Sequence, residues 1–533
     1  MKKNPPAYAK NSSLLGRFLL ALLLLAGWVP AAWSQTSPVT ISPASFTDTT
    51  PITHTFDATL GSGGLANYPG DVYIYTGVIT SLSPSNSNWR YVVNPNFSAP
   101  VAAERMTRLG NNRYSISFTP RSYYPGLSSS SEVVQKLVMV FRGANGTPEG
   151  KGPSNADILV NVAPQPTPGG VAALPAGAKA DGITYINNGT SAILSLTAPN
   201  KNSVHVIGDF NNWQVTSAGQ LHKTSTVNSD PTTGRWWVQV NGLTPGTEYA
   251  YQFLIDGQLR IADPYCEKIL DPNSDQYIPT VTYPNLKPYP TGRTTGIVSV
   301  LQSNPPAYNW TATNFQRPAR TNLVVYELHL RDFIARHDYA TLTDTLKYLQ
   351  RLSVNAIELL PVNEFENNNS WGYNPSFYFA PDKYYGTQNA LKRFIDECHR
   401  RGIAVVLDMV LNHSCDASPM VQLYRDASGP TANNPWYNRT ARHPFNVCND
   451  FNHESQYTKY FTKQVIKFWL QNYRIDGYRF DLSKGFTQVD SGTDVERWGF
   501  FDQSRINIWQ DYYNAQMSVD NASYPILEHF AVN

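Results

Sequence analysis

The C-terminal part of the sequence alternates apolar, strand-like runs with amphipathic helical segments from Thr321 onward. The run "NLVVYELHL" (322–330) precedes the helical segment "TLTDTLKYLQRL" (341–352). The run "NAIELLPV" (355–362) precedes "NALKRFIDECHRRG" (389–402), whose apolar residues recur at helical spacing before a terminating glycine. Strands separated by helices are joined by crossover connections, so this alternation predicts a parallel sheet.

Three further strand-like runs continue the pattern. They are "IAVVLDMV" (403–410), "IDGYRFDL" (475–482) and "YPILEHF" (524–530), with helices expected at 457–473 and around 502–518. Apolar strands that end in polar residues are typical of a (β/α) barrel, whose chemistry lies at the carboxyl ends of its strands. We therefore expect residues 321–533 to form the first five βα units of a TIM (β/α)8 barrel.

The sequence before residue 321 reads as short alternating strands broken by Gly, Pro, Ser and Asn, which is typical of all-β domains. The predicted fold is therefore multidomain, with two N-terminal β-sandwiches before the partial barrel. Its expected segments are a first sandwich at 35–163, a Pro/Gly linker at 164–170, a second sandwich at 171–285 and a further linker at 286–320.

The first 34 residues have the features of a signal peptide. Four basic residues precede the apolar run "FLLALLLLAGWV", and a stretch of small residues follows it. Cleavage is predicted after Ser34, which makes Gln35 the first mature residue. No later apolar run is long enough to span a bilayer, so we expect a protein exported to the periplasm or the medium, with no membrane span in the mature chain.

Charge and cysteine content narrow the possible functions. Lys and Arg together number 42 against 40 Asp and Glu, so no basic excess favours nucleic acid as a partner. Cys266, Cys398, Cys415 and Cys448 are too few and too scattered for a disulfide scaffold or a zinc site. Cys415 and Cys448 bracket a long loop and could pair in an oxidising compartment, but their spacing alone leaves this open.

Polar side chains gather at the ends of three successive predicted strands. They are Asp408, Asn412 and His413 after the third strand, Arg479 and Asp481 on the fourth, and Glu528 on the fifth. Because strand side chains alternate, Arg479 and Asp481 point to the same side. An Arg–Asp pair in a strand is often a structural ion pair, and a lone glutamate at a strand end is often solvated. Three successive strand ends favour a functional site instead.

Two of these carboxyl groups suit complementary roles. The guanidinium beside Asp481 favours its charged form, as a nucleophile requires. Partial desolvation would raise the pKa of Glu528 and suit a general acid. One ionised and one protonated carboxyl, roughly 5–5.5 Å apart, are what retaining glycoside hydrolysis needs, and adjacent strands can supply that separation.

Four motifs resemble glycoside hydrolase family 13, the α-amylase family. They are "WGYNPSFYFAPDKYYGT" (371–387), "DMVLNHS" (408–414), "DGYRFDLSKGF" (476–486) and "ILEHF" (526–530). Their order and their placement on strands also match that family. The resemblance covers about residues 321–533 and implies a glycosidase acting on O-glycosyl bonds of starch, glycogen or maltooligosaccharides.

The resemblance also implies roles for individual residues. Asp481 would be the nucleophile and Glu528 the general acid/base, while Arg479 orients the nucleophile and Asp408 supports the site. Tyr373 would stack beneath the sugar at the cleaved linkage, and His413 would bind that sugar. Asn412 corresponds to a calcium ligand in some members, which leaves a structural calcium ion open, although one amide oxygen cannot make a site of six to eight oxygens. No other cofactor is expected.

The second predicted sandwich resembles carbohydrate-binding module family 48. The resemblance lies in "VIGDFNNW" (206–213) and "YQFLIDG" (251–257). In branching and debranching enzymes a module of this family is the sandwich that precedes the barrel, so the resemblance implies the same arrangement here. Trp213 could stack on a sugar, but a tryptophan in a tight turn is more often part of the core, and we favour core packing.

Several alternatives stay open at this stage. Endo-hydrolysis, debranching and glucan transfer share the same catalytic residues, and a non-catalytic α-glucan-binding protein is a further class. The family region that supplies a third carboxylate is absent from the 533 residues. We therefore expect an incomplete chain, and we expect these 533 residues alone to hydrolyse no α-glucan at a useful rate.

Overall fold

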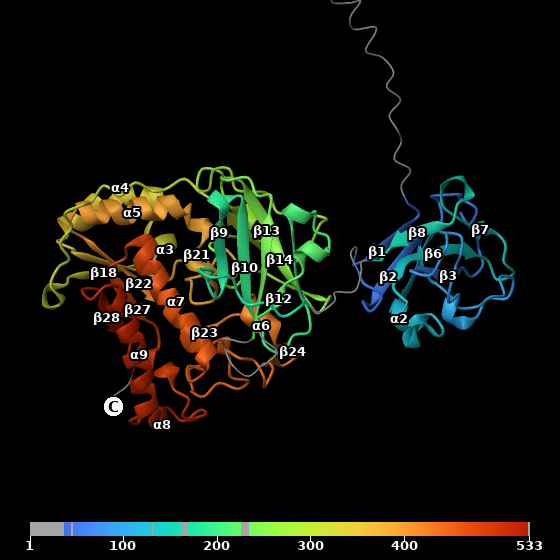
Figure 1. Ribbon diagram of the computed structural model, residues 1–533. Coiled ribbons are helices and arrows are strands. Elements are labelled where there is room, and N and C mark those ends of the chain that lie inside the picture. Colours follow the sequence, from blue (N-terminus) through green and yellow to red (C-terminus); the bar gives the residue numbers. More distant parts are fainter. Residues whose placement is uncertain (1–36, 44–45, 131, 163–168, 225–233, 531–533) are drawn as a thin grey trace, which may run out of the picture. The chain divides into compact units, whose positions relative to one another are not determined.

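The structure is a computed structural model that describes residues 37–530, apart from 44–45, 131, 163–168 and 225–233 (Figure 1). The predicted signal peptide at 1–34 lies outside the described residues, as does most of the predicted linker at 164–170. The chain divides into two compact units, Met1–Val162 and Ala163–Asn533. Each unit is described by itself.

The first unit consists of two antiparallel sheets around one core, as predicted. Phe56 and Phe141, which lie on different sheets, stack at 3.8 Å between ring centroids in this core. One sheet has the order β1 (Val39–Ser42), β2 (Ile52–Asp57), β5 (Arg113–Phe118) and β4 (Thr107–Gly110). The other has β3 (Tyr73–Thr80), β6 (Val134–Arg142) and β7 (Glu149–Gly150), with β8 (Ile158–Asn161) paired to β6.

The second unit begins with another pair of antiparallel sheets. The first has the order β12 (His222–Lys223), β13 (Arg235–Asn241), β10 (Ser191–Thr197) and β9 (Gly182–Ile186). The second has the order β11 (Val204–Gly208), β14 (Glu248–Ile255), β17 (Val298–Gln302) and β16 (Ile269–Leu270), with β15 (Leu259–Ile261) beside β14. Trp213 is buried in the core under this sheet, which confirms the core interpretation.

Strand β17 corrects one predicted boundary. Its residues fall within the segment 286–320 that the sequence analysis assigned to a linker, yet β17 lies between β14 and β16 in the sheet. Val298, Val300 and Leu301 are buried. The strand is separated from β16 by a long loop (271–297), so its place in the sheet depends on a pairing distant in sequence.

The C-terminal part of the second unit contains a five-stranded parallel sheet, and all five predicted strands are present. Its order is β18 (Val325–Leu328), β19 (Ala356–Leu359), β22 (Ala404–Met409), β27 (Gly477–Phe480) and β28 (Tyr524–Leu527). The main helices between them are α4 (Tyr339–Arg351), α5 (Gln388–Arg400), α7 (Gln456–Tyr473) and α9 (Gln503–Val519). Consecutive strands are neighbours, as expected for βα units, and the assignment to a (β/α)8 barrel stays a prediction.

The sheet ends and loops carry short elements. They include the hairpin β20 (Asn363–Phe365) and β21 (Pro375–Pro381), the pairs β23 (His413–Ser414) with β26 (Asn449–Asp450) and β24 (Arg425–Asp426) with β25 (Gly429–Pro430), and the helices α2 (Pro120–Tyr123), α3 (Leu330–Phe333), α6 (Pro419–Leu423) and α8 (Val495–Gly499). Within the described part of the chain, no helix combines the length and apolarity needed to cross a bilayer.

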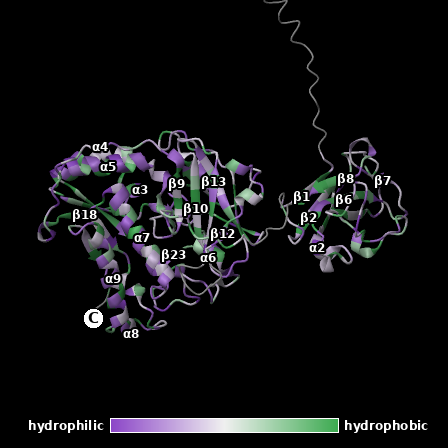
Figure 2. Cartoon of the chain, in the orientation of Figure 1, coloured by the Kyte–Doolittle hydropathy of each residue, from purple (hydrophilic) through white to green (hydrophobic). Residues whose placement is uncertain are grey.

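The second sandwich and the parallel-sheet region share one continuous hydrophobic core, although the sequence suggested separate domains. Tyr265, between β15 and β16, stacks on Phe379 of β21 at 4.9 Å and meets the ring edge of Phe461 on α7 at 5.5 Å. Figure 2 shows apolar and polar residues interleaved along the helices of this unit. The shared core holds the sandwich against α5 and α7.

Cys415 and Cys448 form a disulfide, with their Cα atoms 5.0 Å apart, so the pairing left open by the sequence is present. The bond closes a loop with a sequence separation of 33 residues. In the chain-entropy account, closing such a loop restricts the unfolded chain and stabilises the fold by about 3.7 kcal/mol.

Replacing both Cys415 and Cys448 with serine is therefore expected to lower the free energy of unfolding by about 3.7 kcal/mol. Denaturant titration of the oxidised protein measures this loss. A reducing agent should destabilise the unmodified protein and leave the double variant unchanged. Equal stability of the two oxidised proteins would contradict the prediction.

Candidate active site

Arg479 is the centre of a cluster of carboxylates at the carboxyl ends of neighbouring parallel strands. Its Nη1 atom donates to Asp408 Oδ1 at 3.0 Å and to Asp481 Oδ1 at 2.9 Å. Its Nη2 atom donates to Glu528 Oε1. One guanidinium thus joins side chains from β22, from the end of β27 and from the residue that follows β28.

Strand register explains why these residues meet. Asp408 lies directly opposite Arg479 in the parallel pair β22–β27. The pairing continues past the strand ends, because the Asp481 N–H donates to Met409 O at 3.2 Å and the Glu528 N–H donates to Phe480 O at 3.0 Å. Side chains that the sequence separates by up to 120 positions are therefore brought to one edge of the sheet.

The turn after β27 is shaped around Glu528. Leu482 has φ 44°, in the left-handed region that non-glycine residues adopt at a cost of about 1–2 kcal/mol. This conformation directs the Leu482 N–H to Glu528 Oε2 at 2.9 Å, and the next N–H, of Ser483, donates to Glu528 O at 2.9 Å. These two hydrogen bonds hold Glu528 at the turn that follows Asp481.

Glu358 is a fourth carboxylate in the cluster, and the sequence analysis missed it. It lies on β19, is 9% exposed, and places Oε1 3.8 Å from Arg479 Nε. The one feature of the sequence that could have indicated Glu358 is that it is the single charged residue in the apolar run "NAIELLPV" (355–362). Burying a charge without a partner is costly, so that glutamate required a cation from elsewhere in the chain.

The cluster holds four carboxyl groups against one guanidinium, and its electrostatics follow from this imbalance. Burial raises the pKa of Asp408 to about 8, against the opposing effect of Arg479. Burial likewise raises the pKa of Glu358 and of Glu528. For Glu528 this is the direction expected from the sequence, and burial favours the protonated form of all three carboxyl groups.

The raised pKa of Asp408 predicts a pH-dependent stability. A carboxyl group whose pKa is higher in the folded than in the unfolded chain contributes stability that is full below its unfolded value, here 3.8, and is lost as pH rises to about 8. Asp408→Asn removes this titration. The variant should therefore gain stability relative to the unmodified protein between pH 4 and pH 8, by at most about 1.4 kcal/mol per pH unit. Thermal unfolding across this range measures it, and parallel pH profiles for the two proteins would refute it.

The other predicted site residues connect to the same cluster. Tyr373, in the β20–β21 connection, donates its hydroxyl to Asp408 Oδ2 at 2.5 Å. Asn412 Nδ2 donates to Asp481 Oδ2 at 2.7 Å. His413 Nε2 lies 2.8 Å from Tyr373 O, and burial lowers the pKa of His413. All seven residues named from the sequence therefore lie in one network, and their catalytic and binding roles stay predictions.

The surroundings of Asn412 do not fit the calcium site that the resemblance left open. The Asn412 Oδ1 atom faces His413 Nδ1 at 2.5 Å, and its amide nitrogen is bound to Asp481. Among the described residues, no group of three or more His, Cys, Asp or Glu side chains is placed to hold a metal ion. Calcium requires six to eight oxygen ligands, and this amide oxygen is directed at an imidazole instead.

Comparison with known proteins supports the resemblance for part of the chain. Residues 315–455 match the family model of the alpha amylase catalytic domain. The matched segment contains Glu358, Tyr373, Asp408 and His413 and ends before Arg479.

Similar proteins include enzymes of glucan metabolism. The chain is 29% identical over 331 residues to a 1,4-alpha-glucan branching enzyme (GlgB) of Halothermothrix orenii, covering 58% of this chain and 46% of that enzyme. It is 27% identical over 225 residues to a malto-oligosyltrehalose trehalohydrolase of Saccharolobus solfataricus, covering 42% of this chain and 36% of that enzyme. The matches thus span less than half the length of these two relatives.

Among solved structures, a putative alpha amylase from Salmonella typhimurium aligns with a TM-score of 0.47 at 23% sequence identity, covering 66% of this chain and 50% of that one.

Proposed function

We propose that this chain carries the catalytic carboxylates of an α-glucan-active glycoside hydrolase that retains anomeric configuration. The observation that carries the proposal is the Arg479 cluster, which joins Asp408, Asp481 and Glu528 at the carboxyl ends of successive parallel strands. The match of residues 315–455 to the alpha amylase catalytic domain supports the choice of α-glucans as substrate.

In the proposed reaction Asp481 attacks the anomeric carbon and forms a glycosyl ester, while Glu528 gives its proton to the departing glycosidic oxygen. Glu528, then ionised, takes a proton from water, and that water cleaves the ester and frees Asp481. Arg479 and Asn412 each hold one oxygen of the Asp481 carboxylate, which fixes its orientation for the attack. Burial raises the pKa of Glu528, which favours the protonated form that the first step needs.

The test combines an activity assay with a binding assay. Reducing-sugar release from starch and maltooligosaccharides is measured beside a pull-down on insoluble starch, using the purified chain and any longer product of the same reading frame. Release of sugar with retained α-configuration in proton NMR supports the proposal. Binding without product from either protein would favour the alternative, a non-catalytic α-glucan-binding protein.

Glucan transfer is the second candidate, because the similar protein of Halothermothrix orenii is named as a 1,4-alpha-glucan branching enzyme. Transfer differs from hydrolysis only in what accepts the sugar from Asp481, a glucan hydroxyl or water. Incubation with amylose followed by proton NMR distinguishes them. New α-1,6 linkages without a matching rise in reducing ends indicate branching, and loss of α-1,6 linkages from amylopectin indicates debranching.

We also propose that the protein is exported. The basic and apolar features of residues 1–34 support this, and the Cys415–Cys448 disulfide fits an oxidising compartment. Expression in a Gram-negative host should place the protein in the periplasm or medium, with Gln35 as its first residue. Cytoplasmic protein that keeps residues 1–34 would contradict this.

A further inference from the structure

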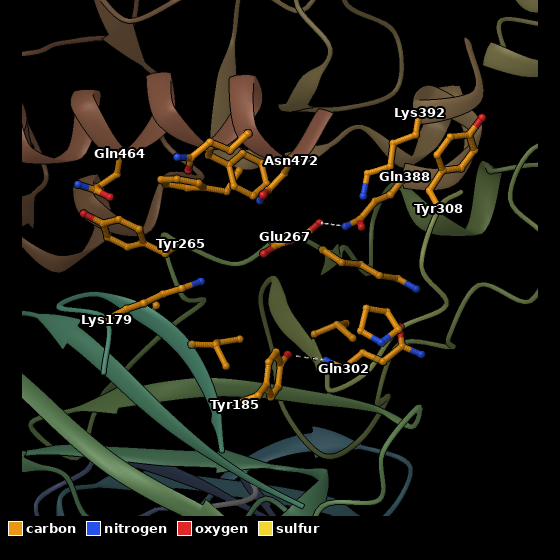
Figure 3. Close-up of a pocket in the computed structure, with 18 of the residues that line it drawn as sticks. Lys179, Tyr185, Tyr265, Glu267, Gln302, Tyr308, Gln388, Lys392, Gln464 and Asn472 are labelled. Carbon is orange, nitrogen blue, oxygen red and sulfur yellow. Dashed lines mark hydrogen bonds between the residues drawn. The ribbon is translucent and has the colours of Figure 1, made fainter. Parts of the chain in front are cut away.

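A cavity of about 970 Å3 lies between the second sandwich and helices α5 and α7, away from the Arg479 cluster (Figure 3). None of the residues that form the Arg479 cluster lines it. Its volume falls within the range of small-molecule sites, about 300–1,000 Å3. The cavity is therefore large enough for a compact ligand such as a mono- or disaccharide.

One polar face of α7 forms a wall of this cavity. Tyr460, Gln464, Lys467 and Gln471 line it at spacings of three and four residues, so they share one side of the helix. Polar helix faces ordinarily meet bulk solvent, but this one is turned toward the sandwich. The aromatic rings of Tyr265 and Phe379, which stack at 4.9 Å, line the cavity beside these polar groups.

The opposite wall belongs to the sandwich and its loops. Figure 3 shows Lys179, Tyr185 and Gln302 extending from the sandwich side, with Glu267 between them and the helices. The Gln302 N–H donates to Tyr185 Oη at 3.0 Å, and Gln388 Nε2 of α5 donates to Glu267 O at 2.7 Å. The first bond joins strands β17 and β9 of the sandwich, and the second ties the segment between β15 and β16 to helix α5.

Glu267 lies between two lysines inside this space. Its side chain is exposed, yet surrounding protein raises its pKa, and the charges of Lys179 and Lys392 act in the opposite direction. An exposed group that is nevertheless desolvated lies in a recess, rather than on an open surface. Burial also lowers the pKa of Lys392, which projects into the cavity from α5.

The charged groups of the lining leave a positive balance. Lys268 is paired with Glu248 at 2.7 Å, and Asp181 is paired with Arg235 at 3.5 Å. Among the described residues, Lys179, Lys392 and Lys467 line the cavity without an ion pair within 4 Å, and Lys179 and Lys392 act on the carboxylate of Glu267. A recess with excess positive charge attracts anions, and lysine binds phosphate as a point charge.

We propose that this cavity is a second ligand site, which binds a saccharide carrying an anionic group such as a phosphate. The lysines bind the anionic group, and the side-chain amides and tyrosine hydroxyls of the lining hydrogen-bond the sugar hydroxyls. Gln464 and Asn472 supply side-chain amides, and Tyr185 supplies its hydroxyl proton. Gln302 and Gln388 supply amide oxygens, because their amide nitrogens are bound to Gly246 O and Glu267 O. The site is separate from the proposed hydrolysis and does not depend on it.

Binding of glucose 6-phosphate, inorganic phosphate and maltotriose to the purified chain is measured by isothermal titration calorimetry. We expect glucose 6-phosphate to bind at least tenfold more tightly than either of the other two. Lys179→Met and Lys392→Met each retain the apolar stem and remove the charge, and each should weaken that binding about tenfold or more. Lys347→Met, on the exposed side of α4, is the matched control and should bind as the unmodified chain does.

Thermal unfolding of each variant verifies that the fold is kept. Absence of glucose 6-phosphate binding, or binding that Lys179→Met and Lys392→Met leave unchanged, overturns the proposal. Equal affinity for inorganic phosphate would show a site for simple anions. Equal affinity for maltotriose that Gln464→Ala and Asn472→Ala weaken would show that this cavity is a neutral sugar site. Either result also overturns it.

Discussion

Asp481→Asn is expected to lower kcat for starch by about 10⁴-fold or more in any active form of this protein, equivalent to about 5.4 kcal/mol of barrier. The asparagine amide keeps the size of the side chain and can still accept from Arg479, but it is a poor nucleophile for the anomeric carbon. Steady-state release of reducing sugar measures the loss. The new amide oxygen can accept from Arg479, but the amide nitrogen then meets Asn412 Nδ2 in place of an acceptor, so thermal unfolding of the variant verifies that the fold is kept.

Asp344→Asn is the matched control, because Asp344 is an exposed aspartate on α4, outside the cluster. It should retain full activity. A fluorinated glycosyl fluoride that accumulates the glycosyl ester should label Asp481, as detected by peptide mass spectrometry. Near-normal turnover by Asp481→Asn, or a label on another residue, would show that the nucleophile is misassigned.

Glu528→Gln is expected to lower the hydrolysis of ordinary glucans by roughly 10³-fold, within the range that general acid catalysis contributes. The departing oxygen of a glucan is a poor leaving group and needs the proton that Glu528 holds. The leaving group of an activated substrate, such as the fluoride of α-maltosyl fluoride, departs without being protonated. The glycosylation rate with this substrate should fall by less than about tenfold in the variant.

Pre-steady-state kinetics separates glycosylation from the later hydrolysis of the ester, which also uses Glu528. Glu496→Gln, an exposed glutamate on α8, is the control and should behave as the unmodified protein. Equal loss of the glycosylation rate for starch and for the fluoride would refute the acid role. Such a result would assign Glu528 to holding Arg479 and the Leu482 turn instead.

The prediction of secondary structure from sequence succeeded where local patterns are strong. Helix α5 was expected at 389–402 and is observed at Gln388–Arg400, because apolar spacing and a glycine after its end are both readable within one segment. The five parallel strands were found for the same reason. Strand β17 was missed because it belongs to its sheet only through pairing with β14 and β16, and no local pattern records that pairing.

The candidate site was recovered to the extent that its residues occur in recognisable motifs. Asp408, Arg479, Asp481 and Glu528 each stand at the end of an apolar strand, where side-chain alternation and strand order already bring them together. Glu358 has no motif, so its place beside Arg479 became visible only with the fold. The Cys415–Cys448 disulfide depends on the distance between the two cysteines in the folded chain, and their separation in sequence does not give that distance.

The sequence by itself determined the order of the β-rich and βα segments, the residues at the strand ends and the class of chemistry they suit, since these depend on periodicity and residue type. Only the tertiary structure decided that four carboxyl groups share one guanidinium, that the pKa of Asp408 is raised to about 8, and that the second sandwich encloses a lysine-lined cavity against α5 and α7. The burial of a side chain and the charges around it depend on neighbours that are distant in sequence. Those neighbours are known only once the chain has packed.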